Sequence, residues 1–302
     1  MNTFLKKARD MVLENDETGL AALLENYADL SISRQEWYEF VDSFAICLKA
    51  EVKHCINMCG SGASRIIKPN LSSVASIYLS ALTGVDFMKS GSAANTGVFG
   101  SSDFFEKIGV LGYKNKSEIL QKFHWGYCDH YELSPWKKYK KIFKKNDNIC
   151  SLIENTVFHD YASDVLYLGI SDPSYAQKLP EYINHNAPGT VKCLYSQQPA
   201  GCIDEITAGA VFFDGRHVCE ALDAECGKLT GAEDVFEIDI QLLNGDCEDR
   251  FWRESLLRTI AVILLDQGHA PDLETGLSRA RSAYENGVAK EHLTAMFENM
   301  IF

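Results

Sequence analysis

The chain has 302 residues, enough to bury one large hydrophobic core or two smaller ones. Its formal net charge of −13 argues against a nucleic-acid partner or an anionic membrane surface, because either requires a basic face. No apolar run is long enough to span a bilayer, and none of the ten cysteines forms a C-x-x-C pair, so we expect a cytoplasmic protein with reduced thiols.

The N-terminal part, to about residue 53, has a helical pattern. Apolar residues recur at helical spacing in Thr3–Asn15, Glu17–Tyr27 and Ser33–Ala50. Ser33, with Glu36 three residues later, resembles a capping box at a helix start. These patterns predict three helices before the first glycine-rich turn.

Glycine and serine then punctuate an alternation of elements. The turn at Gly60 follows an apolar segment, and the sequence after it predicts a helix over Leu71–Leu82 and a strand over Val85–Met88. A second Gly/Ser-rich loop, Ser90–Gly100, precedes a helix from Ser101 that ends at Gly109.

The rest of the chain continues the alternation. Strands are predicted at Val165–Ile170, Val191–Tyr195 and Ala210–Phe213, with a helical pattern at Tyr175–Asn184, and Arg250–Phe302 has the pattern of three helices. Alternating strands and helices indicate an α/β fold, with a sheet covered by helices.

Two distant stretches together predict a site for phosphates and a metal. Backbone N–H groups of the turn Gly60-Ser61-Gly62 can close on a phosphate, and the Ser/Asn-rich helix start from Asn70 adds donors. Asp204 and Glu205 are hard oxygen ligands suited to Mg²⁺. Each feature alone also fits an ordinary turn, a helix cap or a solvated acidic pair, so the prediction depends on their combination.

Five motifs in order give the chain a family resemblance. Anthranilate phosphoribosyltransferases carry G-T-G-G-D, N-I-S-T, K-H-G-N, S-G-S-A-D-x-L-E-x-L-G and later D-E-I-S/T. The matching strings here are residues 60–64, 70–73, 89–92, 99–109 and 204–207. The C-terminal run from Asp272 to Gly287 also resembles the family's last helices. The chain therefore resembles an anthranilate phosphoribosyltransferase over most of its length.

The resemblance implies a two-part fold. A small helical domain would combine residues 1–53 with about 99–123. A larger α/β domain, residues 54–98 and 124–302, would hold a central, mostly parallel sheet covered by helices. The family pattern also implies a homodimer through the helical domain, and an apolar face of Phe4, Ala8, Met11 and Val12 is a candidate contact, although the same face fits an internal core.

The resemblance also implies a donor site for phosphoribosyl pyrophosphate. The donor-binding residues would be Gly60, Ser61, Gly62, Asn70, Ser72, Ser73, Lys89 and Ser101. Mg²⁺ would be held by Ser72, Asp204 and Glu205. Replacing Asp204 and Glu205 by their amides is expected to leave the fold intact and to remove metal-dependent donor binding.

The acceptor half departs from the family pattern. K-H-G-N becomes Lys89-Ser90-Gly91-Ser92, and the family's carboxylate-binding Arg pair aligns with Lys144 and Lys145. Lysine lacks the bidentate fork that suits a carboxylate. The acceptor would contact Ser90, Ser92, Asn95 and Lys144, and we expect an aromatic or heteroaromatic acceptor other than anthranilate.

Three hypotheses remain open. The first is a Mg²⁺-dependent phosphoribosyltransferase for such an acceptor, and the second is an anthranilate phosphoribosyltransferase of tryptophan biosynthesis. The third is a non-catalytic homologue that binds a ligand or nucleic acid. The basic stretch Lys137–Lys145 is interleaved with aromatic residues, but it also fits a solvated helix face, and the overall charge favours that interpretation.

Overall fold

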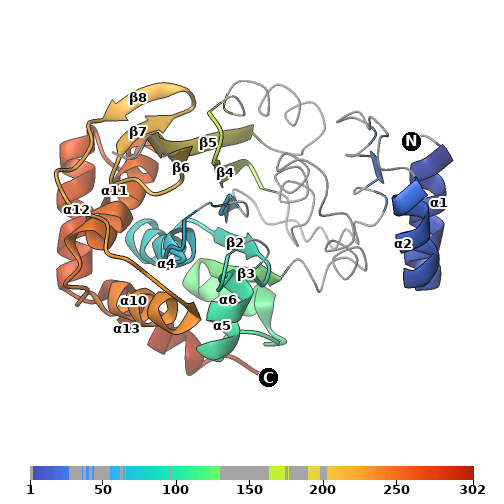
Figure 1. Ribbon diagram of the computed structural model, residues 1–302. Helices are drawn as coiled ribbons and strands as arrows, with labels where there is room; N and C mark the ends of the chain where they lie inside the picture. The colour runs from blue at the N-terminus through green and yellow to red at the C-terminus, as the bar shows by residue number, and fades with distance from the viewer. Residues whose placement is uncertain are drawn as a thin grey trace.

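The architecture is an α/β fold built on one mixed sheet (Figure 1). The computed structural model describes residues 3–26, 36, 39–40, 43, 55–61, 64, 66–94, 97–129, 163–173, 176, 190–197 and 203–302. Within these residues, no helix is long and apolar enough to cross a membrane.

The sheet has the order β3-β2-β1-β4-β5-β7-β8, with β6 paired to β5. Its strands are β1 Ile56–Cys59, β2 Phe87–Gly91, β3 Trp125–Asp129, β4 Val165–Gly169, β5 Thr190–Gln197, β6 Ile203–Asp204, β7 Ala210–Phe213 and β8 Arg216–Cys219. The neighbours from β3 to β5 pair in parallel, whereas β6, β7 and β8 add antiparallel edges. The predicted mostly parallel sheet is therefore confirmed.

The parallel strands are short and almost fully buried. Every residue of β1, β2 and β3 is buried, as expected for strands covered on both faces. The first strand crosses to its neighbour β2 through helix α4, Leu71–Thr83, and the chain later returns to the other side of β1 with β4. This reversal places a topological switch point between β1 and β4.

Helix α4 is the centre of the helical layer. Its residues from Val74 to Ser80 are all buried, and Gly84 ends it in the left-handed region at φ 64°. The Tyr78 hydroxyl donates to the carbonyl of Leu242, 3.1 Å away. The C-terminal helices that pack around it are α10 Ala232–Asn244, α11 Arg250–Asp266, α12 Leu273–Glu285 and α13 Val288–Phe297.

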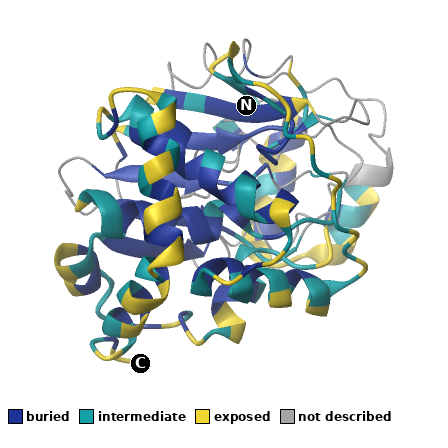
Figure 2. Cartoon of the chain, turned by 90° about the vertical axis from the view of Figure 1, so that its left-hand side faces the viewer, coloured by how far each residue is buried: buried dark blue, intermediate teal, exposed yellow. Residues whose placement is uncertain are grey.

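The C-terminal helices follow an amphipathic pattern, with their outer faces exposed (Figure 2). Helix α11 buries Trp252, Leu256 and Ile260 in the main core. Side-chain caps fix two helix starts, because Asp249 accepts from the Trp252 amide and Asp272 from the Thr275 amide. The three helices predicted over Arg250–Phe302 are confirmed as α11, α12 and α13.

Two short helices, α5 Ser101–Lys107 and α6 Lys116–Phe123, connect β2 to β3. Phe104 and Phe105 of α5 are buried in the same core as the sheet, and the Phe105 ring lies 4.3 Å from that of Tyr127. Residues 99–123 therefore share the core of the sheet. Their predicted grouping with residues 1–53 in one helical domain stays a prediction.

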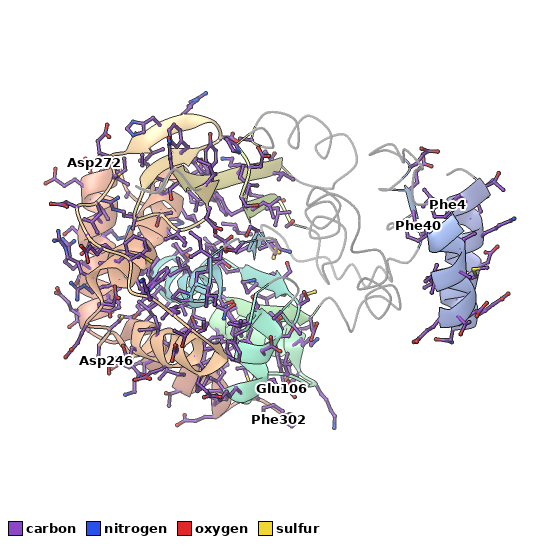
Figure 3. The ribbon with its side chains drawn as sticks, viewed as in Figure 1. Phe4, Phe40, Glu106, Asp246, Asp272 and Phe302 are labelled. Carbon is purple, nitrogen blue, oxygen red and sulfur yellow. The ribbon has the colours of Figure 1, made fainter. Side chains whose placement is uncertain are left out.

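Helices α1 Thr3–Glu14 and α2 Glu17–Asn26 lie apart from the sheet at one end of the view (Figure 1). Phe4 is buried there, as is Phe40 (Figure 3). Ala8 and Val12 are also buried within the chain, so the apolar face of α1 serves as internal core. Met11 of the same face is only partly buried, and the homodimer stays a prediction.

Several element predictions agree with the structure, and others do not. The first two helices, the helix at 71–82 and the strands near 165, 191 and 210 are confirmed, whereas the patterns at Ser33–Ala50 and Tyr175–Asn184 lie almost entirely outside the described residues. The strand predicted at Val85–Met88 begins instead at Phe87 and ends at Gly91. Its end points were wrong because the second half of β2 consists of polar and small residues that are nevertheless buried.

Candidate active site

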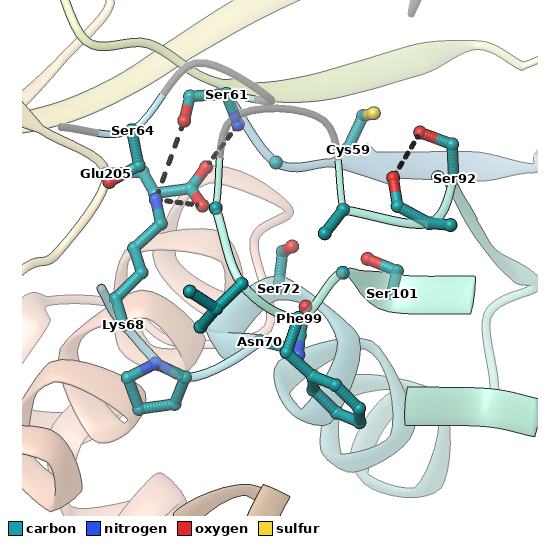
Figure 4. A pocket seen from close by; sticks show the side chains of 18 of the residues that line it. Cys59, Ser61, Ser64, Lys68, Asn70, Ser72, Ser92, Phe99, Ser101 and Glu205 are labelled. Atoms are coloured by element: carbon teal, nitrogen blue, oxygen red, sulfur yellow. Dashed lines mark hydrogen bonds and ion pairs between the residues drawn. The ribbon is translucent and has the colours of Figure 1, made fainter. Parts of the chain in front are cut away.

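A pocket opens where the carboxyl ends of the parallel strands meet, beside the switch point between β1 and β4. Ligands of open α/β sheets bind at such a position, because the loops that leave neighbouring strands diverge there. The pocket is lined by residues that follow β1 and β2 and by the starts of α4 and α5 (Figure 4). Glu205, which follows β6, completes one wall.

A buried ion cluster forms that wall. The Lys68 ammonium lies 2.5 Å from Oδ1 of Asp204 and 2.5 Å from Oε1 of Glu205. Asp204 has no exposed side-chain surface, and the side chains of Lys68 and Glu205 are each 11% exposed. Burial by itself would lower the pKa of Lys68, but the two carboxylates outweigh it and raise that pKa above its usual value.

Backbone and small residues fix the position of Glu205. The Ser61 amide donates to Oε2 of Glu205 at 2.7 Å, so the turn after β1 holds this carboxylate directly. Gly169, at the end of β4, leaves the room for it: a Cβ atom on Gly169 would lie 1.7 Å from Oε2 of Glu205. Only a residue without a side chain is compatible with Glu205 in this place.

A second lysine reaches the pocket from β2. Lys89 is fully buried, and its amine donates to the carbonyl of Ser90. The amine lies near the end of the strand, 3.3 Å from the position that a Cβ on Gly91 would occupy. Burial lowers the pKa of Lys89 below its usual value, although the charge of Glu205 partly opposes this shift. Among the described residues, no carboxylate forms an ion pair with Lys89.

Hydroxyl groups form the floor between the two lysines. Ser72 of α4 and Ser101 of α5 line the pocket, and Ser73 donates to Ser101 at 3.1 Å from a buried position behind it. The start of α4 also directs the positive end of its dipole toward this floor.

A buried carboxylate anchors the turn that precedes α4. Asp239 of α10 accepts from the amide of Asn70 at 2.6 Å and from its side-chain Nδ2 at 2.8 Å. Burial raises the pKa of Asp239 to about 7, against the two hydrogen bonds, which lower it. Because Lys68 is two residues from Asn70, this anchor also sets where the Lys68 side chain starts.

The opposite wall is mostly apolar. Ala93, Ala94 and Val98 line it together with Phe99. Asp103 fixes the loop by accepting from the amides of Ala94 and Gly100 at 2.8 and 2.7 Å. This wall therefore places apolar side chains beside the polar floor.

The structure brings most of the predicted donor residues together. Gly60, Ser61, Asn70, Ser72, Lys89 and Ser101 line the pocket, and Ser73 supports it from behind. Of the predicted acceptor residues, Ser92 lines the pocket, whereas Ser90 is buried and donates to Asn57 in β1. Gly62, Asn95 and Lys144 lie outside the described residues.

The predicted metal ligands have the right chemistry for Mg²⁺, since carboxylate and hydroxyl oxygens are its preferred ligands. All four carboxylate oxygens already accept hydrogen bonds from the protein. The donors are the Lys68 ammonium, the Ser64 hydroxyl and the amides of Ser61 and Glu205. A divalent ion would reach the Asp204–Glu205 pair only after Lys68 has moved away from it, and the assignment of Ser72, Asp204 and Glu205 as metal ligands stays a prediction.

Comparisons with solved structures identify other proteins that share this fold. The chain has a TM-score of 0.72 to the crystal structure of anthranilate phosphoribosyltransferase from Thermus thermophilus, at 19% identity, covering 97% of this chain and 93% of that one. It has a TM-score of 0.76 to the Saccharomyces cerevisiae enzyme in complex with PRPP and Mg, at 17% identity, over 97% and 90% of the two chains. The chain has the anthranilate phosphoribosyltransferase fold.

Sequence comparison points to the same group. A segment of 132 residues is 30% identical to the anthranilate phosphoribosyltransferase of Nitrosopumilus maritimus (strain SCM1), which covers 41% of this chain and 38% of that relative. No protein-family model matches the chain. Another structure with the anthranilate phosphoribosyltransferase fold, the yeast enzyme with 4-fluoroanthranilate, is 15% identical with a TM-score of 0.66, over 97% of this chain and 90% of that one.

Three residues of the site escaped the sequence analysis. Lys68 lies just before the predicted phosphate-binding helix start at Asn70, but no role was predicted for it. Gly169 and Asp239 act on partners far away in sequence, 36 and 169 residues distant. Only the strand end at Gly169 offered a signal, since a glycine at the carboxyl end of a parallel strand fits a close approach.

Proposed function

We propose that this protein is a phosphoribosyltransferase that moves the 5-phosphoribosyl group from phosphoribosyl pyrophosphate to an aromatic or heteroaromatic acceptor. One observation carries the proposal: Lys68, Lys89 and the hydroxyls of Ser72 and Ser101 converge on one pocket at the switch point of this fold. Cations, hydroxyls and a helix start are the groups that bind phosphates.

The reaction needs charge neutralisation and positioning more than covalent help. The bond between ribose C1 and the pyrophosphate oxygen breaks, a bond from C1 to the acceptor nitrogen forms, and the displaced nitrogen proton passes to solvent. Lys89 would stabilise the negative charge on the departing pyrophosphate, and the Gly60–Ser61 backbone would hold its oxygens. Mg²⁺, held by Asp204, Glu205 and Ser72, would neutralise further charge on the pyrophosphate.

The acceptor would lie against the apolar wall formed by Ala93, Ala94 and Val98. The family's His and Asn after the lysine are replaced by Ser90 and Ser92, and Ser90 is engaged with Asn57. A carboxylate on the acceptor would therefore lose an oriented partner, and a buried carboxylate without one is poorly compensated. We expect anthranilate to be at least about tenfold worse in kcat/KM than the natural acceptor, or about 1.4 kcal/mol.

Anthranilate itself is the second candidate acceptor. It is favoured by the name of the 30% identical relative and by the yeast complex with 4-fluoroanthranilate. Efficient turnover of anthranilate by the wild type would select it over our first choice.

The test has two steps. Calorimetric titration with phosphoribosyl pyrophosphate, with and without Mg²⁺, should show binding that strengthens with the metal. Pyrophosphate release should then be measured with a panel of aromatic amines and acids that includes anthranilate. Donor binding without release would point to a missing acceptor, whereas the absence of donor binding would contradict the proposal and favour a non-catalytic homologue.

A further inference from the structure

The Lys68 ammonium uses all of its N–H groups on the wall of the pocket. It contacts Oδ1 of Asp204 and Oε1 of Glu205, both at 2.5 Å, and lies 3.5 Å from Oγ of Ser61 (Figure 4 shows the contacts to Glu205 and Ser61). Three protein oxygens thus surround one positive charge. A small metal cation would bind to the same oxygens.

Because the two carboxylates are buried, the ammonium and a divalent ion cannot occupy the position between them at the same time. The Asp204 side chain is fully buried and that of Glu205 nearly so, and two adjacent carboxylates in such a place repel each other strongly unless a cation lies between them. The ammonium already supplies that cation. A divalent ion can take the position only if the ammonium leaves it.

The backbone near Lys68 is held in place, whereas its side chain is flexible enough for the ammonium to move away from the carboxylates. Its backbone neighbour Asn70 is held by two hydrogen bonds to Asp239, so the start of the side chain is fixed. The flexible four-carbon stem lies along the pocket, so the ammonium can rotate toward an anion bound there when it gives up its contacts to Asp204 and Glu205.

We propose that Lys68 competes with a divalent metal ion for Asp204 and Glu205, so that this pair binds free metal weakly as long as the ammonium is in place. The inference rests on the proposed function in one respect, since the metal is the one that would accompany the phosphoribosyl donor. An anionic donor phosphate that attracts Lys68 therefore opens the carboxylate pair to the metal, and donor and metal bind cooperatively.

The test uses Mn²⁺ alone, with no donor present. Titration of the intact protein is followed by the electron paramagnetic resonance signal of the free ion. Lys68→Met removes the competing charge and keeps the length of the side chain, so it should bind Mn²⁺ at least tenfold more tightly than the wild type, about 1.4 kcal/mol. Adding Glu205→Gln to Lys68→Met should abolish the gain.

A matched control is available at Lys107. This lysine forms one exposed ion pair, 2.7 Å from Glu233, outside the pocket. Lys107→Met should leave Mn²⁺ affinity at the wild-type value. Equal Mn²⁺ affinity of the wild type and Lys68→Met would overturn the inference.

The wild type alone also decides the question if Lys68→Met does not fold. Low-micromolar Mn²⁺ binding that is lost in Glu205→Gln would show that the ammonium does not compete, and would overturn the inference. Mn²⁺ binding that is weaker than this and is still lost in Glu205→Gln supports it. Failure of the proposed function is recognised separately, because it appears as a lack of phosphoribosyl pyrophosphate binding in the calorimetric titration, which the Mn²⁺ experiment does not use.

Discussion

Lys68 and Lys89 line the same pocket but have opposite electrostatic surroundings. Lys68 lies between two carboxylates, which raise its pKa, whereas among the described residues no carboxylate forms an ion pair with Lys89, and burial lowers its pKa although the charge of Glu205 partly opposes this shift. A cation that already has counter-ions contributes to the fold, and a buried cation without them is costly until an anion arrives. The difference indicates that, before a ligand binds, Lys68 neutralises the wall of the site, whereas Lys89 is the cation available to the ligand.

The largest effect should come from removing the two carboxylate charges beside Lys68, so that both lysines are buried without an ion pair. Asp204→Asn with Glu205→Gln leaves the ammonium buried without a carboxylate, and the free energy of unfolding should fall by about 3 kcal/mol or more. Sequence analysis led us to expect an intact fold for this double variant, but Asp204 is fully buried. Urea denaturation measures the effect.

The single variant Glu205→Gln is the control, because Lys68 keeps Asp204 as a partner. It should lose less than half as much stability as the double variant. A double variant as stable as the wild type would show that the ion cluster contributes nothing to the fold.

The next effect concerns Lys89 and the ligand. Lys89→Met should lower the affinity for phosphoribosyl pyrophosphate about 100-fold, or about 2.7 kcal/mol, because it removes a buried cation that forms no ion pair with the described carboxylates. The same change should leave thermal stability unchanged or raise it, because a buried charge is replaced by an apolar group of similar length. Calorimetry and a thermal melt on the same sample measure both.

Lys107→Met provides the comparison for a lysine outside the pocket and should bind the donor normally. If Lys89→Met lost stability and donor affinity together, its role would be structural, and the contrast with Lys68 would disappear.

A smaller effect should follow from crowding Glu205. Gly169→Ala places a methyl group where the Glu205 carboxylate lies, so that carboxylate must move away from Ser61 and Lys68. We expect donor binding in the presence of Mg²⁺ to weaken about tenfold, about 1.4 kcal/mol. Gly231→Ala is the matched control, because a Cβ there meets nothing within 4 Å. Equal donor affinities of the two alanine variants would show that the space beside Gly169 is not needed for donor binding.

The smallest effect is a pH dependence at the anchor of the Lys68 turn. The pKa of Asp239 is about 7 in the folded protein and about 3.8 when exposed, so the folded state holds the extra proton between these values. Its contribution to stability is fully present below about pH 4 and is lost as the pH rises through about 7. The free energy of unfolding should therefore fall by about 1 kcal/mol or more across this window from this group alone.

Denaturation at a series of pH values, compared with Asp239→Asn, isolates this contribution, because other titrating groups cancel in the difference. A difference that does not change between pH 4 and 8 would contradict the raised pKa.

The parts of the fold that could be predicted have strong local patterns. Helix α4 was found from its run of apolar and small residues, and the parallel strands near Val165 and Val191 from short, mostly apolar runs. Strand β3 was missed although Trp125 and Tyr127 alternate on it, because Gly126 and the polar flanks resemble a turn. Strand β8 and helix α10 were also missed, in a segment rich in charged residues.

The site was predictable where motifs are local and unpredictable where partners are distant. The turn at Gly60 and the start of α4 are contiguous in sequence, so their common role could be inferred. The ion pair of Lys68 joins residues 136 positions apart, and no property of either residue alone indicates it. Burial of Ser90 against Asn57 likewise depends on the register of β1 with β2.

The glycine at position 169 limits how the sequences of related chains can vary. Because the Glu205 carboxylate fills the space beside Gly169, the two positions cannot vary independently. A chain with a larger residue at the end of β4 should carry a shorter one at position 205. Covariation of these two columns in an alignment would therefore record the same contact that the structure shows.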